Sequence, residues 1–232
     1  AGLFLPLTYI HALTPDATVV IFPSDHFVHP EERFLDAVRR MTDSARRMPD
    51  RLVLLGVRPD RLETEYGWIL PGKPLPSHAR EPVRGVESFI EKPTPVQAGH
   101  ALRHGALWNT FVVAARAGLL WQIGWRCFPD LMRCFEQLTR AIGQPQELEI
   151  LDAIYHDMPA YNLSTHLLQQ AAESIAVIEL RDVLWSDWGK PVRVAETLRR
   201  IGRVPAFPLE YLETPLATDS VPGRSQEPTI QP

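Results

Sequence analysis

Short apolar runs rich in β-branched residues alternate with amphipathic segments along most of this 232-residue chain. Runs of the first kind are typical of buried strands, and segments of the second kind are typical of helices that cover a sheet. The runs predict strands at residues 17–23, 52–56, 65–70, 83–92, 110–115, 174–180 and 183–185. The amphipathic segments predict helices at 30–47, 95–104 and 192–201, with further helices dominating 118–157. The alternation indicates an α/β fold with one sheet and helices on both faces.

Composition excludes several classes of partner. With 45% apolar and 22% charged residues, the chain resembles an ordinary soluble globular protein. Its net charge of −4 gives no general attraction to nucleic acid or to an acidic membrane. Its apolar runs are shorter than the roughly 18 residues of a membrane span, and its apolar start lacks the basic flank of a signal peptide. We therefore expect a cytoplasmic protein with neither a nucleic-acid nor a membrane partner.

Length and proline content predict the domain organisation. The chain is long enough for one sizeable core, so we expect a single α/β domain over residues 1–204. Residues 205–232 contain six prolines, with few large apolar residues after Leu216. We expect that segment to be an extended arm, disordered at its end.

The two cysteines bear on the redox environment. Cys127 and Cys134 are seven positions apart in what the pattern predicts to be one helix. Residues two helical turns apart are too distant to form a disulfide with each other. We therefore expect two reduced thiols in the core, as is usual in the cytosol.

Two aspartates follow predicted strands at distant places in the chain. Asp25 lies in the motif PSDH (residues 23–26), and Asp187 lies in WSDWG (residues 185–189). Two carboxylates at the C-terminal edge of an open sheet could share Mg²⁺, which neutralises phosphate charge during phosphoryl or nucleotidyl transfer. The alternative is that each aspartate only caps a turn or a helix. The two motifs together favour the metal, and we predict carboxyl groups within roughly 4–7 Å of each other.

Polar residues between these motifs suit a sugar phosphate. Gly67, in ETEYGW (residues 63–68), would let a ligand approach the backbone closely. In FIEKP (residues 89–93), Glu91 would accept hydrogen bonds from hydroxyls and Lys92 would neutralise a phosphate. Asn109, in LWN, could both donate to and accept from a sugar hydroxyl pair. The alternatives are a strand kink at Gly67, a solvated strand end at Glu91 and Lys92, and a turn cap at Asn109. Because all four follow strand signals, we predict one cleft beside the aspartates.

Taken in order, the motifs are PSDH, LG-x-x-P-x-x-x-E-T-x-Y-G, FIEKP, LWN and WSD-x-G. This set resembles the sugar-1-phosphate nucleotidyltransferases, most closely the mannose-1-phosphate guanylyltransferases, from about Thr14 to about Arg203. Each motif is weak alone, whereas five in the same order are specific. The resemblance implies a Rossmann-like nucleotidyltransferase sheet. It also implies a reaction in which a sugar 1-phosphate attacks the α-phosphate of a nucleoside triphosphate and pyrophosphate is released.

The resemblance also implies a role for each candidate residue. Asp25 and Asp187 would hold the Mg²⁺ that bridges the phosphates, and Lys92 would meet the sugar phosphate. Glu91 and Asn109 would bind sugar hydroxyls, and Gly67 would offer its backbone to the sugar. No side-chain nucleophile is required, because the substrate phosphate attacks and the protein supplies positioning and charge neutralisation. GTP and mannose 1-phosphate are the favoured substrates.

The chain departs from the family pattern at the nucleotide end. The family's glycine-rich loop, G-G-x-G-T-R-L, holds the triphosphate, but here no two glycines stand closer than five positions. Glu65 replaces the first glycine of the family's GYG, and Thr165 stands where an aspartate is expected. We therefore expect the N-terminal part of the fold to be missing and this chain alone to be inactive. A sheet that lacks its first strand would expose an edge, which favours a homodimer.

Two other functions remain open. The first is a non-catalytic sugar-nucleotide-binding or regulatory subunit that pairs with an active homologue. The second is an α/β phosphatase or hydrolase that uses Asp25. A phosphatase would normally carry a second aspartate soon after the nucleophilic one, and the sequence Asp25-His26-Phe27 lacks it.

Overall fold

The computed structural model describes residues 2–76 and 82–208, and the contacts divide the chain into two units. The first unit is Ala1–Trp185 and the second is Ser186–Pro232. Of the predicted C-terminal arm, residues 209–232 lie outside the described part of the chain. A single domain over residues 1–204 stays a prediction.

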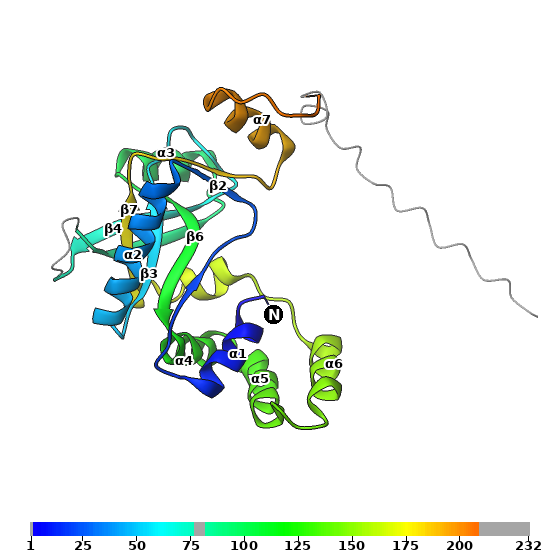
Figure 1. Ribbon diagram of the computed structural model, residues 1–232. Coiled ribbons are helices and arrows are strands. Elements are labelled where there is room, and N and C mark those ends of the chain that lie inside the picture. Colours follow the sequence, from blue (N-terminus) through cyan, green and yellow to red (C-terminus); the bar gives the residue numbers. More distant parts are fainter. Residues whose placement is uncertain (1, 77–81, 209–232) are drawn as a thin grey trace, which may run out of the picture. The chain divides into compact units, whose positions relative to one another are not determined.

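Helices and strands alternate along the first unit (Figure 1). Its helices are α1 (Phe4–Leu13), α2 (Glu31–Arg47), α3 (Pro95–Arg103), α4 (Ala117–Cys127), α5 (Pro129–Ala141) and α6 (Glu147–Asp157), followed by a π-helical turn (Ser164–Leu168) and a 3-10 turn (Ala172–Ser174). Its strands are β1 (Thr18–Ile21), β2 (His26–His29), β3 (Leu52–Val57), β4 (Gly67–Pro74), β5 (Arg84–Glu91), β6 (Leu107–Arg116) and β7 (Ile175–Leu180). Strand β8 (Leu184–Asp187) runs into the second unit, which contains α7 (Pro191–Arg200).

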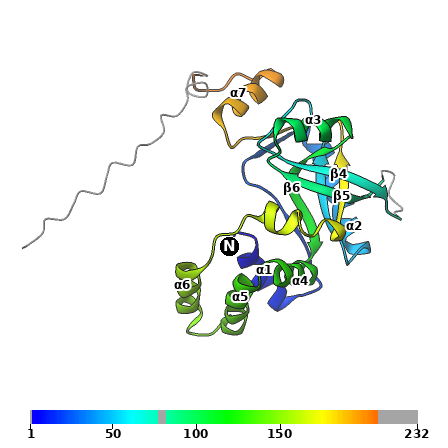
Figure 2. The same ribbon diagram turned by 180° about the vertical axis from the view of Figure 1, so that it is seen from behind.

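Six strands form the central sheet in the order β1-β6-β3-β7-β5-β4. Figures 1 and 2 show this sheet from opposite sides. Strands β3 and β7 are parallel, with Leu52 opposite Ile175 and Val57 opposite Leu180. Strand β6 is antiparallel to both β1 and β3, so β1, β3 and β7 run in the same direction. Their carboxyl ends therefore meet at one edge of the sheet, where ligands bind in open α/β folds.

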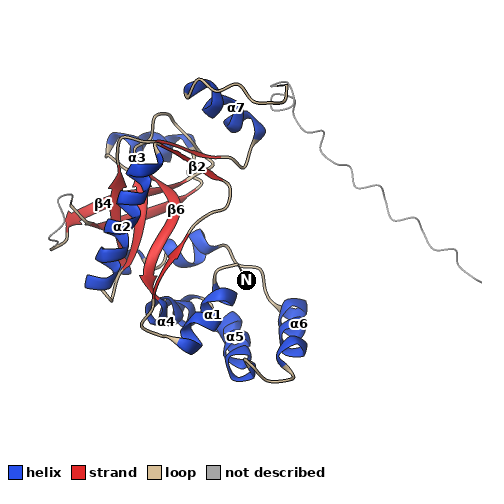
Figure 3. Ribbon diagram, viewed as in Figure 1, coloured by secondary structure: helices blue, strands red, loops and turns tan. Residues whose placement is uncertain are grey.

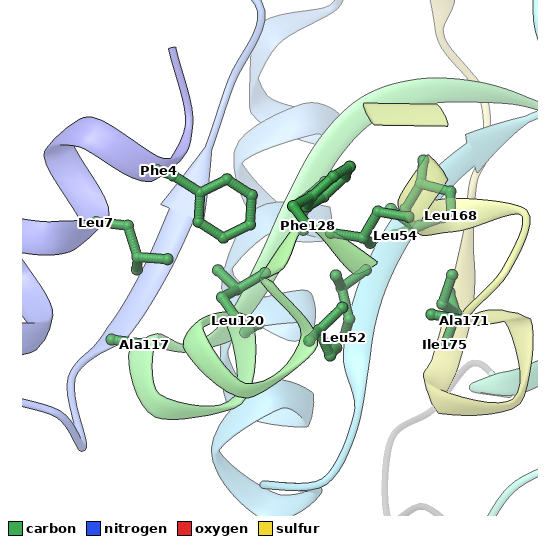
Figure 4. Packing of buried hydrophobic residues seen from close by; sticks show 14 of the residues in the cluster. Phe4, Leu7, Leu52, Leu54, Ala117, Leu120, Phe128, Leu168, Ala171 and Ile175 are labelled. Carbon is green, nitrogen blue, oxygen red and sulfur yellow. The ribbon is translucent and has the colours of Figure 1, made fainter. Parts of the chain in front are cut away.

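Helices cover both faces of this sheet (Figure 3). Successive residues of β3 alternate between the two faces: Leu52 and Leu54 join a core with α1, α4 and α5, whereas Val53 and Leu55 join a core with α2 and α3. Figure 4 shows the first core, in which side chains from α1, α4, β3 and β7 pack together. A strand buried on both faces must be apolar throughout, which explains the continuous run LVLLGV.

The predicted fold class, α/β with helices on both faces of the central sheet, is confirmed. Strand β8, which ends at Asp187, is not among the six strands of that sheet. The expectation that Asp25 and Asp187 both follow strands of one sheet is therefore wrong for Asp187. The short strand β2 was not predicted, because only two apolar residues, Phe27 and Val28, stand between its terminal histidines. Among the described residues, no helix combines the length and the apolar character that crossing a bilayer would require.

One prediction about the cysteines is wrong. Cys127 ends α4 and Cys134 lies in α5, so they do not share a helix. Pro129 explains the break, because proline disrupts a helix interior but suits the first position of a new helix. Both cysteines are free thiols and partly buried against the first core.

Candidate functional site

Gly67, Glu91 and Asn109 lie together where β4, β5 and β6 meet. Gly67 stands opposite Glu91 in the β4–β5 register, and β6 pairs with the same part of β4. A Cβ atom on residue 67 would lie 2.8 Å from Glu91 Oε2, 3.4 Å from Asn109 Cβ and 2.7 Å from Phe89 Cζ. Only glycine leaves the space in which these side chains sit. The structure thus brings together three of the residues that the sequence predicted to bind a sugar.

The Asn109 amide is buried, and its Nδ2 donor is unsatisfied in the described part of the chain. Asn109 is 3% exposed, and its Oδ1 accepts a hydrogen bond from Phe111 N at 3.1 Å. Its Nδ2 is buried and has no hydrogen-bond partner among the described residues. Phe111 has φ of 58°, a left-handed conformation that is uncommon for a bulky residue. This local turn fixes Oδ1, whereas Nδ2 stays unsatisfied within the described part of the chain.

The Glu91 carboxyl provides the complementary acceptor. Its Oε2 is buried and has no hydrogen-bond donor among the described residues. Burial raises the pKa of the Glu91 carboxyl, while the Ser164 hydroxyl and the Lys92 charge oppose that shift. A buried donor and a buried acceptor left unsatisfied each cost free energy. Sugar hydroxyls, which donate and accept, are chemically suited to satisfy both.

Lys92 follows Glu91 directly and leaves the strand. It adopts φ of 46°, and its backbone N–H donates to Tyr66 O at 3.2 Å. Because this left-handed conformation ends the alternation of β5, Lys92 need not point to the opposite face from Glu91. Its side chain is exposed, next to the buried group.

Aromatic rings form a second feature near the glycine. The Tyr66 ring lies edge-on to Trp108 and Trp185, with centroids 5.1 and 5.2 Å away, and His26 lies 5.1 Å from Trp185. The indole N–H groups of Trp108 and Trp185 are buried without an acceptor among the described residues. The Arg61 guanidinium lies 5.3 Å from the Trp108 ring centroid. Sequence reasoning assigned Tyr66, Trp108 and Trp185 no role, although all three stand inside the quoted motifs.

Asp25 lies in the first unit, between β1 and β2. Its side chain is 55% exposed, and its Oδ1 is 3.8 Å from His26 Nε2. Since β1 runs in the same direction as β3 and β7, Asp25 follows the carboxyl end of a sheet strand, as predicted from the sequence. An exposed carboxylate at that edge is open to solvent cations and phosphates.

Asp187 lies in the second unit, at the end of β8. Its Oδ2 is 3.1 Å from Arg193 Nη1, and Arg193 of α7 is only 7% exposed at its side chain. Its Oδ1 accepts a hydrogen bond from Gly189 N. Asp187 therefore does cap a turn, which was the alternative to a metal-binding role. The pair with Arg193 was not predicted, because an ion pair between a loop and the next helix leaves no periodic signal.

Mg²⁺ at phosphoryl-transfer sites is commonly held by one or two carboxylates, with substrate phosphates completing the shell. A carboxylate has about four lone-pair sites, so Asp187 could bind a cation while keeping Arg193. Within residues 2–76 and 82–208, no three His, Cys, Asp or Glu side chains gather into a metal site. Asp25 and Asp187 belong to different units, so the approach of their carboxyl groups stays a prediction.

Comparison with known proteins places this geometry in a family. The profile of a family described as Nucleotidyl transferase matches residues 7–201. The chain belongs to the nucleotidyl transferase family. The resemblance to sugar-1-phosphate nucleotidyltransferases, read from the five motifs, is thereby confirmed.

The relatives of this nucleotidyl transferase share one named activity. Mannose-1-phosphate guanylyltransferase ManC of Salmonella typhimurium is 28% identical over 141 residues, and an Escherichia coli mannose-1-phosphate guanylyltransferase is 28% identical over 140. Each match covers 60% of this chain and 29% of the relative. The chain thus matches less than a third of the length of these relatives.

Solved structures support the same fold. A Thermus thermophilus protein described as a mannose-1-phosphate geranyltransferase has a TM-score of 0.69 and 27% identity, with 89% of this chain and 56% of that chain covered. A Helicobacter pylori protein described as a mannose-6-phosphate isomerase has a TM-score of 0.61 and 23% identity, covering 78% of this chain and 69% of that chain. The second likeness shows the fold alone.

Proposed function

We propose that this nucleotidyl transferase domain binds a sugar 1-phosphate, with mannose 1-phosphate favoured, for transfer of GMP from GTP. One observation carries the proposal: Gly67, Glu91 and Asn109 meet at one place, where two of them present unsatisfied buried polar atoms. The names of the relatives supply the substrate class. Because this chain matches only part of their length, the activity of the whole protein is part of the proposal.

The chain's own residues would act by positioning. Asn109 Nδ2 would donate to one sugar hydroxyl, and Glu91 Oε2 would accept from another. Gly67 would keep a side chain out of the space between them, and exposed Lys92 would meet the phosphate. Holding the sugar phosphate in one orientation lowers the entropic part of the barrier to its attack on the nucleotide.

Mg²⁺ suits the carboxylates of Asp25 and Asp187, which we propose as its ligands. When bound, the cation would neutralise phosphate charge as the bond to pyrophosphate breaks. The chain supplies no glycine-rich loop to grip a triphosphate through backbone N–H groups. We therefore propose that the 232-residue chain by itself binds sugar phosphate without efficient turnover.

Calorimetric titration with mannose 1-phosphate tests the sugar site. We expect Asn109→Ala to weaken binding by roughly 1–3 kcal/mol, because Glu91 then loses its partner in recognising the sugar. Gln137→Ala removes an exposed amide from α5 and is the matched control, expected to bind normally. Failure of the unmodified chain to bind, or equal affinity for it and Asn109→Ala, would contradict the proposed site.

A second candidate is a non-catalytic regulatory subunit, favoured by the absent glycine-rich loop and by the Arg193 ion pair on Asp187. Pyrophosphate release from GTP, mannose 1-phosphate and Mg²⁺ separates the two candidates. Turnover near 1 s⁻¹, within the ordinary range for enzymes, would establish catalysis by this chain and exclude the regulatory role. Background release, with sugar phosphate still bound, would leave the binding assignment intact and favour a partner for catalysis.

A further inference from the structure

A cavity of about 450 Å³ opens in the first unit, lined by residues of β4, β5, β6, β7 and α3 and of the connections next to them. Its polar walls come from Arg58, Arg84, Glu179 and Arg181. Its apolar walls include Pro59, Pro71, Leu102, Leu107 and Val177. None of these residues belongs to the sugar-site group, which is Gly67, Glu91, Lys92 and Asn109, and none is Asp25 or Asp187. The volume lies within the range of small-molecule sites, about 300–1,000 Å³.

The cavity occurs where the strand pairing is irregular. The β3–β6 register shifts between Leu54 and Gly56, and the β4–β5 register shifts between Leu70 and Pro71. Pro71 lines the cavity, and a proline cannot donate a ladder hydrogen bond. Bulges of this kind are common next to binding sites, because they redirect side chains out of a regular sheet. Arg84 and Glu179 stand on strands β5 and β7, whereas Arg58 directly follows the end of β3. Side chains on strands are held more firmly than side chains on loops.

Three guanidinium groups and one carboxylate give the cavity a net positive charge. Glu179 pairs with two of the arginines: its Oε1 accepts from Arg58 Nε, and its Oε2 accepts from Arg181 Nη2 at 2.8 Å. A single carboxylate cannot neutralise three arginines. The excess of positive charge favours an anionic ligand.

Two of the arginines that line the cavity are anchored through Nε, and the Arg58 side chain is largely exposed. Arg58 engages Glu179 through Nε, and Arg84 engages Gly72 O through Nε at 2.8 Å. The Nη groups of both side chains make no hydrogen bond or ion pair with any residue of the described ranges. Anchoring each side chain at Nε orders it and leaves two parallel N–H donors, the arrangement that binds phosphate oxygens bidentately.

We propose that this cavity binds the phosphate group of a small phosphorylated molecule, at a site separate from the one described above. The guanidinium groups of Arg58 and Arg84 take the phosphate oxygens. Glu179 holds Arg58 and Arg181 in place and limits the charge to what one phosphate group offsets. The prolines, Leu107 and Val177 provide an apolar wall for the rest of the ligand. The proposal does not depend on the activity of the domain.

The test is calorimetric titration of the full chain with pyrophosphate, and separately with inorganic phosphate, in the absence of Mg²⁺. Omitting Mg²⁺ suppresses binding that needs the two aspartates. We expect Arg58→Ala and Arg84→Ala each to lower pyrophosphate affinity at least about tenfold, because each removes a charge-assisted bidentate contact. Arg39→Ala, an exposed arginine of α2 paired with Asp36, is the matched control for loss of one positive charge.

Glu179→Gln provides a variant that should change affinity in the opposite direction. It keeps one acceptor oxygen, enough for Arg58, but loses the second acceptor and the neutralising charge. We therefore expect tighter pyrophosphate binding, with a stronger dependence on salt. Circular dichroism checks that each variant is folded. The proposal fails if neither anion binds, if the two cavity variants match Arg39→Ala, or if folded Glu179→Gln binds more weakly than the unmodified chain.

Discussion

At the scale of single residues, the sugar-site group depends on the absence of a Cβ atom at Gly67. Gly67 has no Cβ, and the space this leaves is filled by Phe89 and Glu91. Its role is therefore steric, as in a close approach of two chains, and no unusual backbone angle is needed. The alternative considered from the sequence was that Gly67 allows a kink in the strand backbone. In the structure, Gly67 instead makes room for the side chains of Phe89 and Glu91.

Gly67→Ala should destabilise the protein by about 1–3 kcal/mol, the usual cost of overpacking. The added methyl group would lie within 3 Å of Phe89 and Glu91, which must then move. Gly85→Ala in β5 is the control, since its Cβ would meet nothing closer than 3.9 Å. Urea unfolding measures both variants. Equal stabilities for the two variants would show that the site tolerates a side chain.

Glu91 should make stability depend on pH. Burial raises the folded-state pKa of Glu91 above its ordinary 4.5, so its ionisation costs the folded state more than the unfolded state. The associated stability is present below pH 4.5 and is lost as pH rises through the folded-state pKa. We expect Glu91→Gln to raise the melting temperature at pH 7 and to have little effect at pH 4. If Glu91→Gln changed the melting temperature by the same amount at both pH values, ionisation of Glu91 would not be the cause.

At the scale of elements, helix α1 is held to α4 by a stacked pair of rings. The His11 and Trp121 rings are 4.6 Å apart at centroid and inclined by only 7°. Burial lowers the pKa of His11 from its ordinary 6.5, so the folded protein favours the neutral ring. The corresponding stability is present above pH 6.5 and is lost as pH falls through the folded-state pKa.

His11→Phe keeps a ring on Trp121 but removes the titrating group. We expect thermal stability to vary less between about pH 5 and 7 in this variant than in the unmodified chain. His100→Phe, at an exposed position of α3, should leave the slope unchanged. If His11→Phe retained the full slope, another group would have to be responsible for it.

The ion pair between Asp187 and Arg193 ties β8 to α7. Arg193→Met would leave the Asp187 carboxylate with the Gly189 N–H as its one partner among the described residues. The expected cost is about 1.5–3 kcal/mol, as for a charged hydrogen bond. We expect faster hydrogen exchange in α7, while Arg203→Met, an exposed residue beyond the helix, should have no effect. Unchanged protection of α7 in Arg193→Met would mean that the pair contributes nothing to the order of this helix.

At the scale of the whole molecule, the periodicity of apolar residues predicted the elements that are buried against the sheet and its cores. Strand β3 and helix α2 could be located because apolar residues facing a core repeat at 2 or 3.6 positions. The meeting of Gly67, Glu91 and Asn109 could be expected because each follows a strand signal. Features set by contacts distant in sequence left no such signal: the burial of Glu91 beside Ser164, the Arg193 pair, and the arginine cavity that needs two register shifts.

The parallel pairing of β3 with β7 has a consequence for how the chain acquires its structure. Leu52 finds its partner Ile175 only after β4, β5, β6 and four helices have been made. Closing so long a loop lowers the entropy of the chain before the strand contact stabilises it, and this slows folding. During synthesis on the ribosome, one edge of the apolar strand LVLLGV would stay unpaired until β7 is made. An unpaired apolar edge favours aggregation. The yield of correctly folded protein should therefore depend on what shields this strand during synthesis.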